Sequence, residues 1–234
     1  MILNYLRIFG HSIHQNALTV CSTRKLFTKE FLRVTEFESQ RLKTRKFVQP
    51  DTVVETIEFQ LRAKNREELI KSFKPWIHVI DRSQCKEHFS LLMKCLLFLR
   101  DNPHPDPPKN FNFGPVVMRM FHSLNMSQEA INIAHNFETA DLFDDATSPI
   151  ILCDLLFNNG MYNEVLRVVQ RNEAMNEKRD MKTTRLLNCI TFATCYKLNT
   201  QDHFSFALEI WNKSVKENQH SQAINFLCMN AVNP

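Results

Sequence analysis

The chain has 234 residues, 44% of them hydrophobic, and a formal net charge of +4, so it is long enough for one globular domain or two small ones. Its three glycines, at positions 10, 114 and 160, are too few for a glycine-rich phosphate loop or a dinucleotide-binding fingerprint. They also disfavour a strand-rich fold with many tight turns. No run of about 18 apolar residues occurs, so no membrane span is expected.

The positive charge is concentrated at the N-terminus. Residues 1–50 contain nine Lys or Arg and three acids, a net charge of +6, whereas the remaining 184 residues hold 20 basic and 22 acidic residues, a net charge of −2. This larger part lacks the general basic surface that supplies non-specific affinity for phosphates. It leaves room only for a local basic stripe.

The seven cysteines show neither metal nor disulfide spacing. Their number is odd, and no two of them are arranged as CxxC. Several lie within apolar helical segments, where free cysteine behaves as a small hydrophobic residue. We therefore predict buried, reduced thiols and a reducing compartment rather than a secreted disulfide scaffold.

Residues 1–27 are predicted to be a mitochondrial presequence without fixed structure. No acid precedes Glu30, and Arg7, Arg24 and Lys25 stand among interspersed apolar, Ser and Thr residues, which is typical of a transit peptide rather than a secretory signal. Such a segment works as an amphipathic helix with one basic face. The alternative is the basic terminus of a cytosolic protein, and the cleavage site cannot be fixed.

Residues 28–101 are predicted to form an N-terminal helical region. Apolar residues recur at helical intervals over residues 28–47, 51–73 and 81–102. We expect Pro75 to end or kink the second of these segments. Asp81 or Ser83 is the expected N-cap of the third. Residues 102–110 contain four prolines, so we expect a stiff, extended linker and the main organisational boundary there.

Residues 111–234 are predicted to be repeated helical hairpins. Residues 112–134 and 148–169 align with an offset of 35, which pairs Asn125 with Gly160, Glu129 with Glu164 and Phe121 with Leu156. Pro115 and Pro149 both stand near a helix start, where a missing N–H costs least, and Ser148 is the expected N-cap. The expected units are 111–145, 146–181, 182–219 and a partial fourth unit, 220–234.

The expected fold is therefore all-α. Helical hairpins bury their faces only by stacking on neighbours, which predicts a right-handed α–α superhelix, or solenoid, of hairpins. Each turn needs a residue that tolerates positive φ, and Asn125, Gly160 and Asn199 stand at the matching positions. The partial fourth unit has no second helix in this chain, so it is either a cap or part of a longer array.

The repeat resembles the pentatricopeptide repeat (PPR) family. The tetratricopeptide repeat has a similar length, but its Trp/Gly/Tyr and Ala pattern is absent from this sequence. The second helices "NNGMYNEVLRVV", "QEAINI" and "FALEIW" are similar to the PPR second helix. Four further segments are similar to animal mitochondrial members of the family: "RKLFTKEFLRVTEF" (24–37), "FGPVVMR" (113–119), "ILCDLLFNNGMYNEVLRVV" (151–169) and "FATCYKLN" (192–199).

This resemblance implies a helical-repeat protein of the mitochondrial matrix that binds RNA and has no enzymatic activity. It implies a role in the maturation of mitochondrial transcripts, and hence in respiratory chain function, together with protein partners of a processing complex. It implies no cofactor and no small-molecule substrate. The alternative is a scaffold that binds proteins in a mitochondrial RNA-processing or ribosomal assembly, which the net charge of −2 after residue 50 favours.

PPR proteins read one base per repeat with a side chain of each first helix. In this chain that position falls at Val116, Ile151 and Ile190, whose side chains cannot hydrogen-bond a base. The base code therefore cannot be applied. Basic and polar residues on the expected groove remain candidates for contacts that position RNA without specifying its sequence; for each, the alternative is a solvated helix face. They are Arg119, Ser123, Asn158, Lys182, Arg185 and Lys197.

No pattern indicates catalysis. The histidines have no His or Cys partner at a metal-ligand spacing. Asp144 and Asp145 are adjacent, as in a helix cap or a solvated turn, and no set of carboxylates marks the metal ions of a nuclease. We therefore expect no catalytic residue and no metal site.

Overall fold

The computed structural model describes residues 26–103, 112–136, 138–175 and 181–216. Within these ranges all regular structure is helical, in eleven α-helices and one short 3₁₀ helix, which confirms the predicted all-α class. Most of the expected presequence, the proline-rich segment and the partial fourth unit lie outside these ranges. None of the described helices is both long and apolar enough to cross a bilayer.

Five helices precede the proline-rich segment, and they divide differently from the prediction. They are α2 (Val34–Thr44), α3 (Pro50–Ala63), α4 (Arg66–Val79), α5 (Arg82–Glu87) and α6 (Phe89–Asp101). The segment 51–73, expected as one helix, breaks at Lys64, which has a φ of 52°. The side chain of Asn65 then caps α4 by accepting the Glu68 N–H. Pro75 lies inside α4 rather than ending it.

The helix expected over residues 81–102 is likewise two helices. Asp81, one of the two expected candidates, is the N-cap of α5, and it forms a reciprocal capping box with Gln84. The chain then turns at His88, which ends α5 and precedes α6. This break has no glycine or proline to mark it in the sequence.

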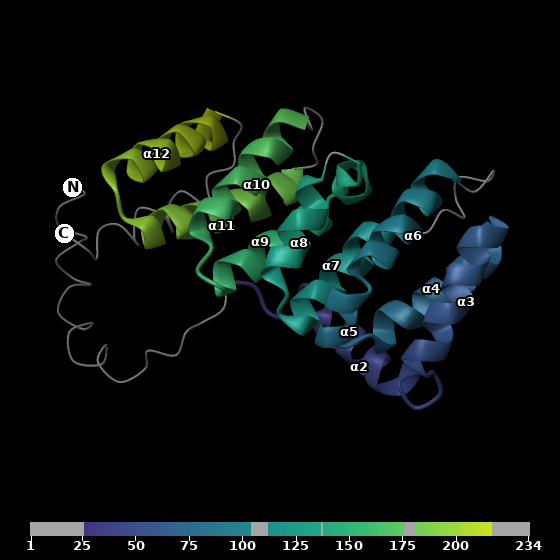
Figure 1. Ribbon diagram of the computed structural model, residues 1–234. Helices are drawn as coiled ribbons and strands as arrows, with labels where there is room; N and C mark the ends of the chain where they lie inside the picture. Colours follow the sequence, from purple (N-terminus) through teal and green to yellow (C-terminus); the bar gives the residue numbers. More distant parts are fainter. Residues whose placement is uncertain (1–25, 104–111, 137, 176–180, 217–234) are drawn as a thin grey trace, which may run out of the picture.

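Seven helical segments follow the proline-rich segment. They are α7 (Phe113–Leu124), α8 (Ser127–His135), η2 (Ala140–Phe143), α9 (Ser148–Asn158), α10 (Tyr162–Met175), α11 (Met181–Leu198) and α12 (Gln201–Lys216). The pairs α7/α8 and α9/α10 lie within the ranges 111–145 and 146–181, whereas α11 begins one residue before the range 182–219 and α12 lies inside it. Figure 1 shows these helix pairs following one another across the molecule, with α3 towards one end and α12 at the other.

Each of the three hairpins turns through a residue with positive φ. The values are 52° at Asn125, 71° at Gly160 and 47° at Asn199. In the first two turns the following N–H reaches back five residues, from Met126 to the Phe121 carbonyl and from Met161 to the Leu156 carbonyl. This closure satisfies the last carbonyls of the first helix.

The same turn joins α3 to α4. Lys64 takes the left-handed conformation, and the Asn65 N–H donates to the Gln60 carbonyl over 3.1 Å. The hairpin motif therefore extends into residues 28–101. The sequence gives no signal for this hairpin, because lysine rarely adopts positive φ, whereas glycine and asparagine do so readily.

One hydrophobic core continues across the proline-rich segment. Buried residues from Phe27 to Ile190 form a single cluster, in which the rings of Phe73 on α4 and Phe113 on α7 meet edge to face with centroids 5.7 Å apart. A smaller cluster around Phe192, Ala207 and Ile210 joins α11 and α12 and includes Leu166 of α10. The expected boundary at residues 102–110 therefore does not separate two cores.

Helix α9 lies at the centre of this core. Every residue from Ser148 to Leu156 is buried, as expected for a helix that is apolar all round. Its N-terminus is capped by the Asp145 carboxylate, which accepts the N–H groups of Thr147 at 2.7 Å and Ser148 at 3.0 Å. Ser148, the expected N-cap, instead donates its hydroxyl to Asp145.

Most of the described cysteines are buried free thiols, as predicted. Cys85, Cys95, Cys153 and Cys195 are buried, and Cys189 is half-buried. Burial raises the pKa of Cys85 and Cys95 to about 12 and that of Cys195 to about 11. Cys21 and Cys228 lie outside the described residues.

These raised pKa values predict slow alkylation of the folded protein. The thiolate is the reactive form, so a thiol with a pKa of about 12 is only about 0.01% ionised at pH 8. We expect iodoacetamide at pH 8 to label Cys85 and Cys95 only after denaturation, as measured by peptide mass spectrometry. Rapid labelling of both cysteines in the native protein would contradict this arrangement.

Candidate nucleic-acid interface

Two neighbouring pockets share Arg33 and Arg119. The first, here called the α11 pocket, has a volume of about 330 Å³ and lies between residues 31–33, α7, the start of α9 and the start of α11. The second, here called the α4 pocket, has a volume of about 300 Å³ and lies between α2, α4 and α7. Because they share two arginines, we treat them as one surface feature, the basic groove.

Arg119 is the central cation of the basic groove. Its Nε donates to the Leu32 carbonyl over 2.8 Å, which connects α7 to the segment before α2. Burial, and next the nearby Arg33, lower the pKa of Arg119. Within the described residues its two terminal nitrogens form no hydrogen bond or ion pair. The guanidinium therefore holds the fold through one nitrogen and presents two others to the groove.

Arg33 is held in an unusual backbone conformation. Its φ is 58°, a left-handed geometry that a non-glycine residue adopts only when its surroundings fix it. The neighbouring Leu32 side chain, 3% exposed, supplies that anchor in the core. The Arg33 side chain is exposed and lies 3.6 Å from the Glu36 carboxylate, a weak surface pair.

Lys182 and Lys74 complete the cations of the groove. Lys182 is the second residue of α11 and is exposed in the α11 pocket, where Thr183 is its neighbour. Lys74 lines the α4 pocket on the other side of Arg119. That pocket also contains the rings of Phe37 and His78, whose centroids are 4.5 Å apart. The groove thus combines cations with aromatic surface.

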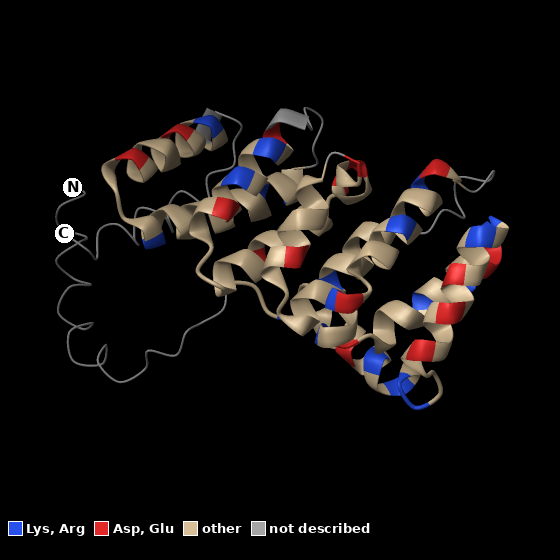
Figure 2. Ribbon diagram, viewed as in Figure 1, with Lys and Arg blue, Asp and Glu red and all other residues tan. Residues whose placement is uncertain are grey.

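Figure 2 shows the distribution of charged residues over the whole molecule: they are frequent on α3 but sparse over α8 and α9.

The structure divides the six candidate RNA contacts. Arg119 and Lys182 line one pocket, whereas Lys197 lies fifteen residues further along α11, about 22 Å away at the helical rise of 1.5 Å per residue. Arg185 is half-buried between them on α11, and Ser123 is half-buried near the end of α7.

Asn158, the remaining candidate, is exposed, but its side chain hydrogen-bonds to a polar cluster around the buried Asp154. Its Nδ2 donates to Oδ2 of Asp154 over 2.8 Å, and Nε2 of His122 lies 2.8 Å from the same oxygen. Asp154 is 1% exposed. The cluster ties α7 to α9 inside the protein, so Asn158 has a structural contact of its own besides any ligand.

Arg33 and Lys74, which line the basic groove, were not among the sequence candidates. Both precede the repeats, and the register that located the other candidates starts only at residue 111. The one sequence signal for Arg33 was the excess of basic residues over residues 1–50. For Lys74 no signal was available.

The expected base-reading positions do not share a surface. Ile151 and Ile190 are both 0% exposed and belong to the core. Val116 is half-buried and lines the α4 pocket. The base code fails here for a second reason beyond chemistry, because two of its three positions are inside the protein.

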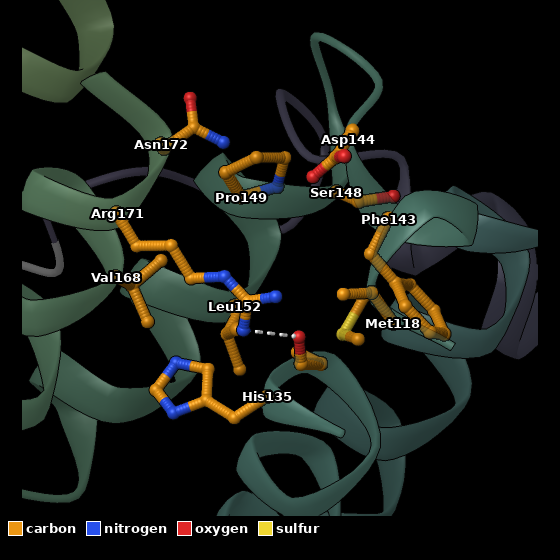
Figure 3. A pocket seen from close by; sticks show the side chains of 12 residues that line it. Met118, His135, Phe143, Asp144, Ser148, Pro149, Leu152, Val168, Arg171 and Asn172 are labelled. Atoms are coloured by element: carbon orange, nitrogen blue, oxygen red, sulfur yellow. Dashed lines mark hydrogen bonds between the residues drawn. The ribbon is translucent and has the colours of Figure 1, made fainter. Parts of the chain in front are cut away.

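A second, smaller cavity lies between α8, η2, α9 and α10 (Figure 3). Its volume of about 30 Å³ suits about two water molecules, far less than the roughly 300 Å³ or more of a ligand site. Arg171 crosses it to donate to the Ala134 carbonyl over 3.0 Å. Asp144 lines this cavity, and burial raises its pKa. Its neighbour Asp145 caps α9, so the two carboxylates have separate surroundings.

Among the residues that the structure describes, no three His, Cys, Asp or Glu side chains come together as ligands for a metal ion.

Successive antiparallel hairpins, turning through positive-φ residues and stacked on one core, define the class of helical-repeat proteins. Five curated proteins match the chain, all named mitochondrial pentatricopeptide repeat-containing protein 2. The chain is similar to the protein of that name from Pongo abelii (31% identity over 105 residues, 45% of this chain and 26% of the relative). It is also similar to those from Homo sapiens (34% over 94 residues, 40% and 23%) and Danio rerio (25% over 187 residues, 80% and 47%).

These matches confirm the resemblance to animal mitochondrial PPR proteins. The matched region spans between about a quarter and a half of the length of the relatives. No protein-family model matches the chain, and no solved structure matches it.

Proposed function

We propose that this chain is a non-enzymatic RNA-binding factor of the mitochondrial matrix that assists the processing of mitochondrial transcripts and thereby supports the respiratory chain. The names of its relatives, which place them in mitochondria and among PPR proteins, support this proposal. We propose further that the stacked hairpins follow a right-handed superhelix, as in other helical-repeat arrays.

The observation that carries the proposal is the basic groove. Arg33, Lys74, Arg119 and Lys182 line two adjoining pockets in a chain that is net negative after residue 50. Cations in a groove hold the phosphate backbone of RNA and set its position. Because Ile151 and Ile190 are in the core, we expect this binding to depend weakly on base sequence.

A charge-removing double variant tests the proposal. Lys182→Glu combined with Arg33→Gln removes two exposed cations and leaves the Arg119 contact to Leu32 intact. We expect roughly tenfold weaker binding of a single-stranded RNA, about 1.4 kcal/mol. Each lost phosphate contact should lower the slope of log affinity against log salt by about 0.7. Fluorescence anisotropy across a salt series measures both.

Lys94→Glu is the control for charge, since Lys94 is an exposed cation on α6 outside both pockets and its replacement changes the net charge by −2, against −3 in the double variant. It should leave RNA affinity within about twofold. Equal losses in the control and the double variant would mean that net charge, not the groove, governs binding.

The second candidate function is a protein-binding scaffold. An open groove of about 640 Å³ lies between α8 and α10, lined by Gln128, Asn132 and Asn136 beside Glu164 and Arg167. Crosslinking of the tagged chain in mitochondria, followed by sequencing of attached RNA, separates the two candidates. Enrichment of mitochondrial transcripts supports the RNA proposal. Stable co-purification of a protein without any enriched transcript would favour the scaffold.

A further inference from the structure

Phe31 presents an aromatic ring in the wall of the α11 pocket. The residue is 48% exposed, which is unusual for a large apolar side chain in a lined pocket. Its ring stacks on Phe27, with centroids 5.5 Å apart and an interplanar angle of 24°. Phe27 is 8% exposed. One face of the Phe31 ring is therefore covered by a buried partner, and its remaining exposure belongs to the rest of the ring.

The backbone that carries Phe31 is fixed from both sides. Its own N–H donates to Oγ1 of Thr28 over 3.1 Å, and the Val34 N–H donates to the Lys29 carbonyl over 2.8 Å. Next to Phe31, the carbonyl of the buried Leu32 accepts a hydrogen bond from Nε–H of Arg119. A ring held in this way loses little conformational freedom when a flat ligand stacks on it.

Three cations surround this aromatic surface. Arg33, Arg119 and Lys182 line the same pocket as Phe31, above apolar surface from Ile150 and Leu186. The nearby acids are occupied: Glu36 lies beside Arg33, and Asp145 accepts the N–H groups that begin α9. An aromatic ring beside cations is the arrangement that stacks an unpaired base and holds its phosphate.

We propose that the α11 pocket receives one unpaired nucleotide of single-stranded RNA, with its base on Phe31 and its phosphate between Arg119 and Lys182. This inference rests on the proposed function and adds a specific anchor to it. The anchor lies partly outside the repeats, because Phe31 and Arg33 precede α2. Since every base has a stacking face, this contact tolerates any base, in keeping with the loss of the base code.

The test combines protein variants with abasic RNA. A short single-stranded RNA is made in a series, each member lacking one base, and affinity is measured by fluorescence anisotropy. In the wild-type chain, one abasic position should weaken binding about 5- to 150-fold, the usual range for one stacked base. Phe31→Leu keeps the apolar surface but has no aromatic face, so it should lose a similar factor on intact RNA. In this variant no abasic position should cause a further loss.

Phe31→Tyr is the matched control, because tyrosine keeps the aromatic face and should keep the wild-type affinity. Wild-type affinity in Phe31→Leu, or the same abasic losses in Phe31→Leu as in the wild type, would overturn the stacking contact. The same holds for a Phe31→Tyr variant that binds as weakly as Phe31→Leu. Thermal melting by circular dichroism checks that each variant is folded, and the abasic series on the wild-type chain tests the contact without any variant.

The outcomes separate this inference from the proposed function. If the wild-type chain binds no RNA, both fail. If RNA binds and the loss in Lys182→Glu with Arg33→Gln is found, but no base position is sensitive to Phe31, only the nucleotide anchor fails. Adenosine monophosphate as a competitor distinguishes a site for free nucleotides: it should displace the RNA at most weakly, because the chain of neighbouring phosphates supplies most of the affinity. Full displacement at a stoichiometric concentration would overturn the assignment to RNA.

Discussion

Replacing Ile151 with asparagine is expected to unfold the chain rather than to give it a base preference. Ile151 occupies an expected base-reading position, yet it is fully buried on α9. Losing its apolar surface costs about 1.5–3 kcal/mol and an unsatisfied buried amide about 1–3 kcal/mol. The total, about 2.5–6 kcal/mol, is a large part of the roughly 5–15 kcal/mol that stabilises a typical domain.

Val116→Asn is the control for this experiment. Val116 holds the same repeat position but is half-buried and lines the α4 pocket, so asparagine there can reach water. We expect its free energy of unfolding to change by about 1 kcal/mol or less. Urea titration followed by circular dichroism measures both variants. A folded Ile151→Asn variant with altered RNA preference would show that α9 exposes this position in solution.

Gly114→Ala is expected to be strongly destabilising despite its small size. A Cβ at this position would lie 2.5 Å from the Leu142 carbonyl oxygen, 2.6 Å from Oγ of Ser148 and 2.7 Å from Oδ2 of Asp145. The last two atoms belong to the cap of α9, and the first is backbone that cannot turn aside. Overpacking of this kind typically costs about 1–3 kcal/mol, although alanine in an open helix would be favoured by up to about 1 kcal/mol.

Gly160→Ala separates this steric effect from a conformational one. At Gly160 an added Cβ has no atom within 4 Å, but the residue has a φ of 71°. Alanine in this left-handed conformation costs about 1–2 kcal/mol. Gly160→Asn should recover most of that loss, because asparagine already occupies the matching turns. Thermal melting should place the wild type highest, then Gly160→Asn. A Gly114→Ala variant as stable as the wild type would contradict the close packing of α7 on the loop before α9.

The turns and breaks between helices are predictable from the sequence only where the residue at the turn favours positive φ. The three repeat turns were predictable, because Gly160 set the register and asparagine at 125 and 199 is compatible with positive φ. The hairpin at Lys64 and the break at His88 carry no such residue, and tertiary packing decides them. Pro75 was expected to end or kink a helix. It lies inside α4 without ending it, and the buried Phe73, Trp76 and Ile77 hold both sides of the proline in the core.

The candidate site was predictable only in part. A repeat register assigns positions on helices, so it located Arg119 and Lys182, which share the α11 pocket. It does not say which helix faces other segments cover. Residues 31–33 cover part of α7 and add Phe31 and Arg33 to the pocket, although they are distant in sequence. The burial of Ile151 and Ile190 could not be predicted for the same reason, since it depends on neighbouring helices that a repeat register does not place.

The continuous core has a consequence for how this chain unfolds. Helices α2 and α4 pack on α7 within one apolar cluster, whereas the buried apolar residues of α12 belong to a smaller cluster that they share with α11 and with Leu166 of α10. Helical arrays are held together by nearest-neighbour contacts, so their ends open most easily. Here α2 and α4 are held in the central cluster by α7, so among the described helices we expect α12, whose main packing partner is α11, to open first. Residues 111–216 cut away from residues 26–103 would leave α7 with an uncovered apolar face, so the excised repeats are not an independent cooperative unit.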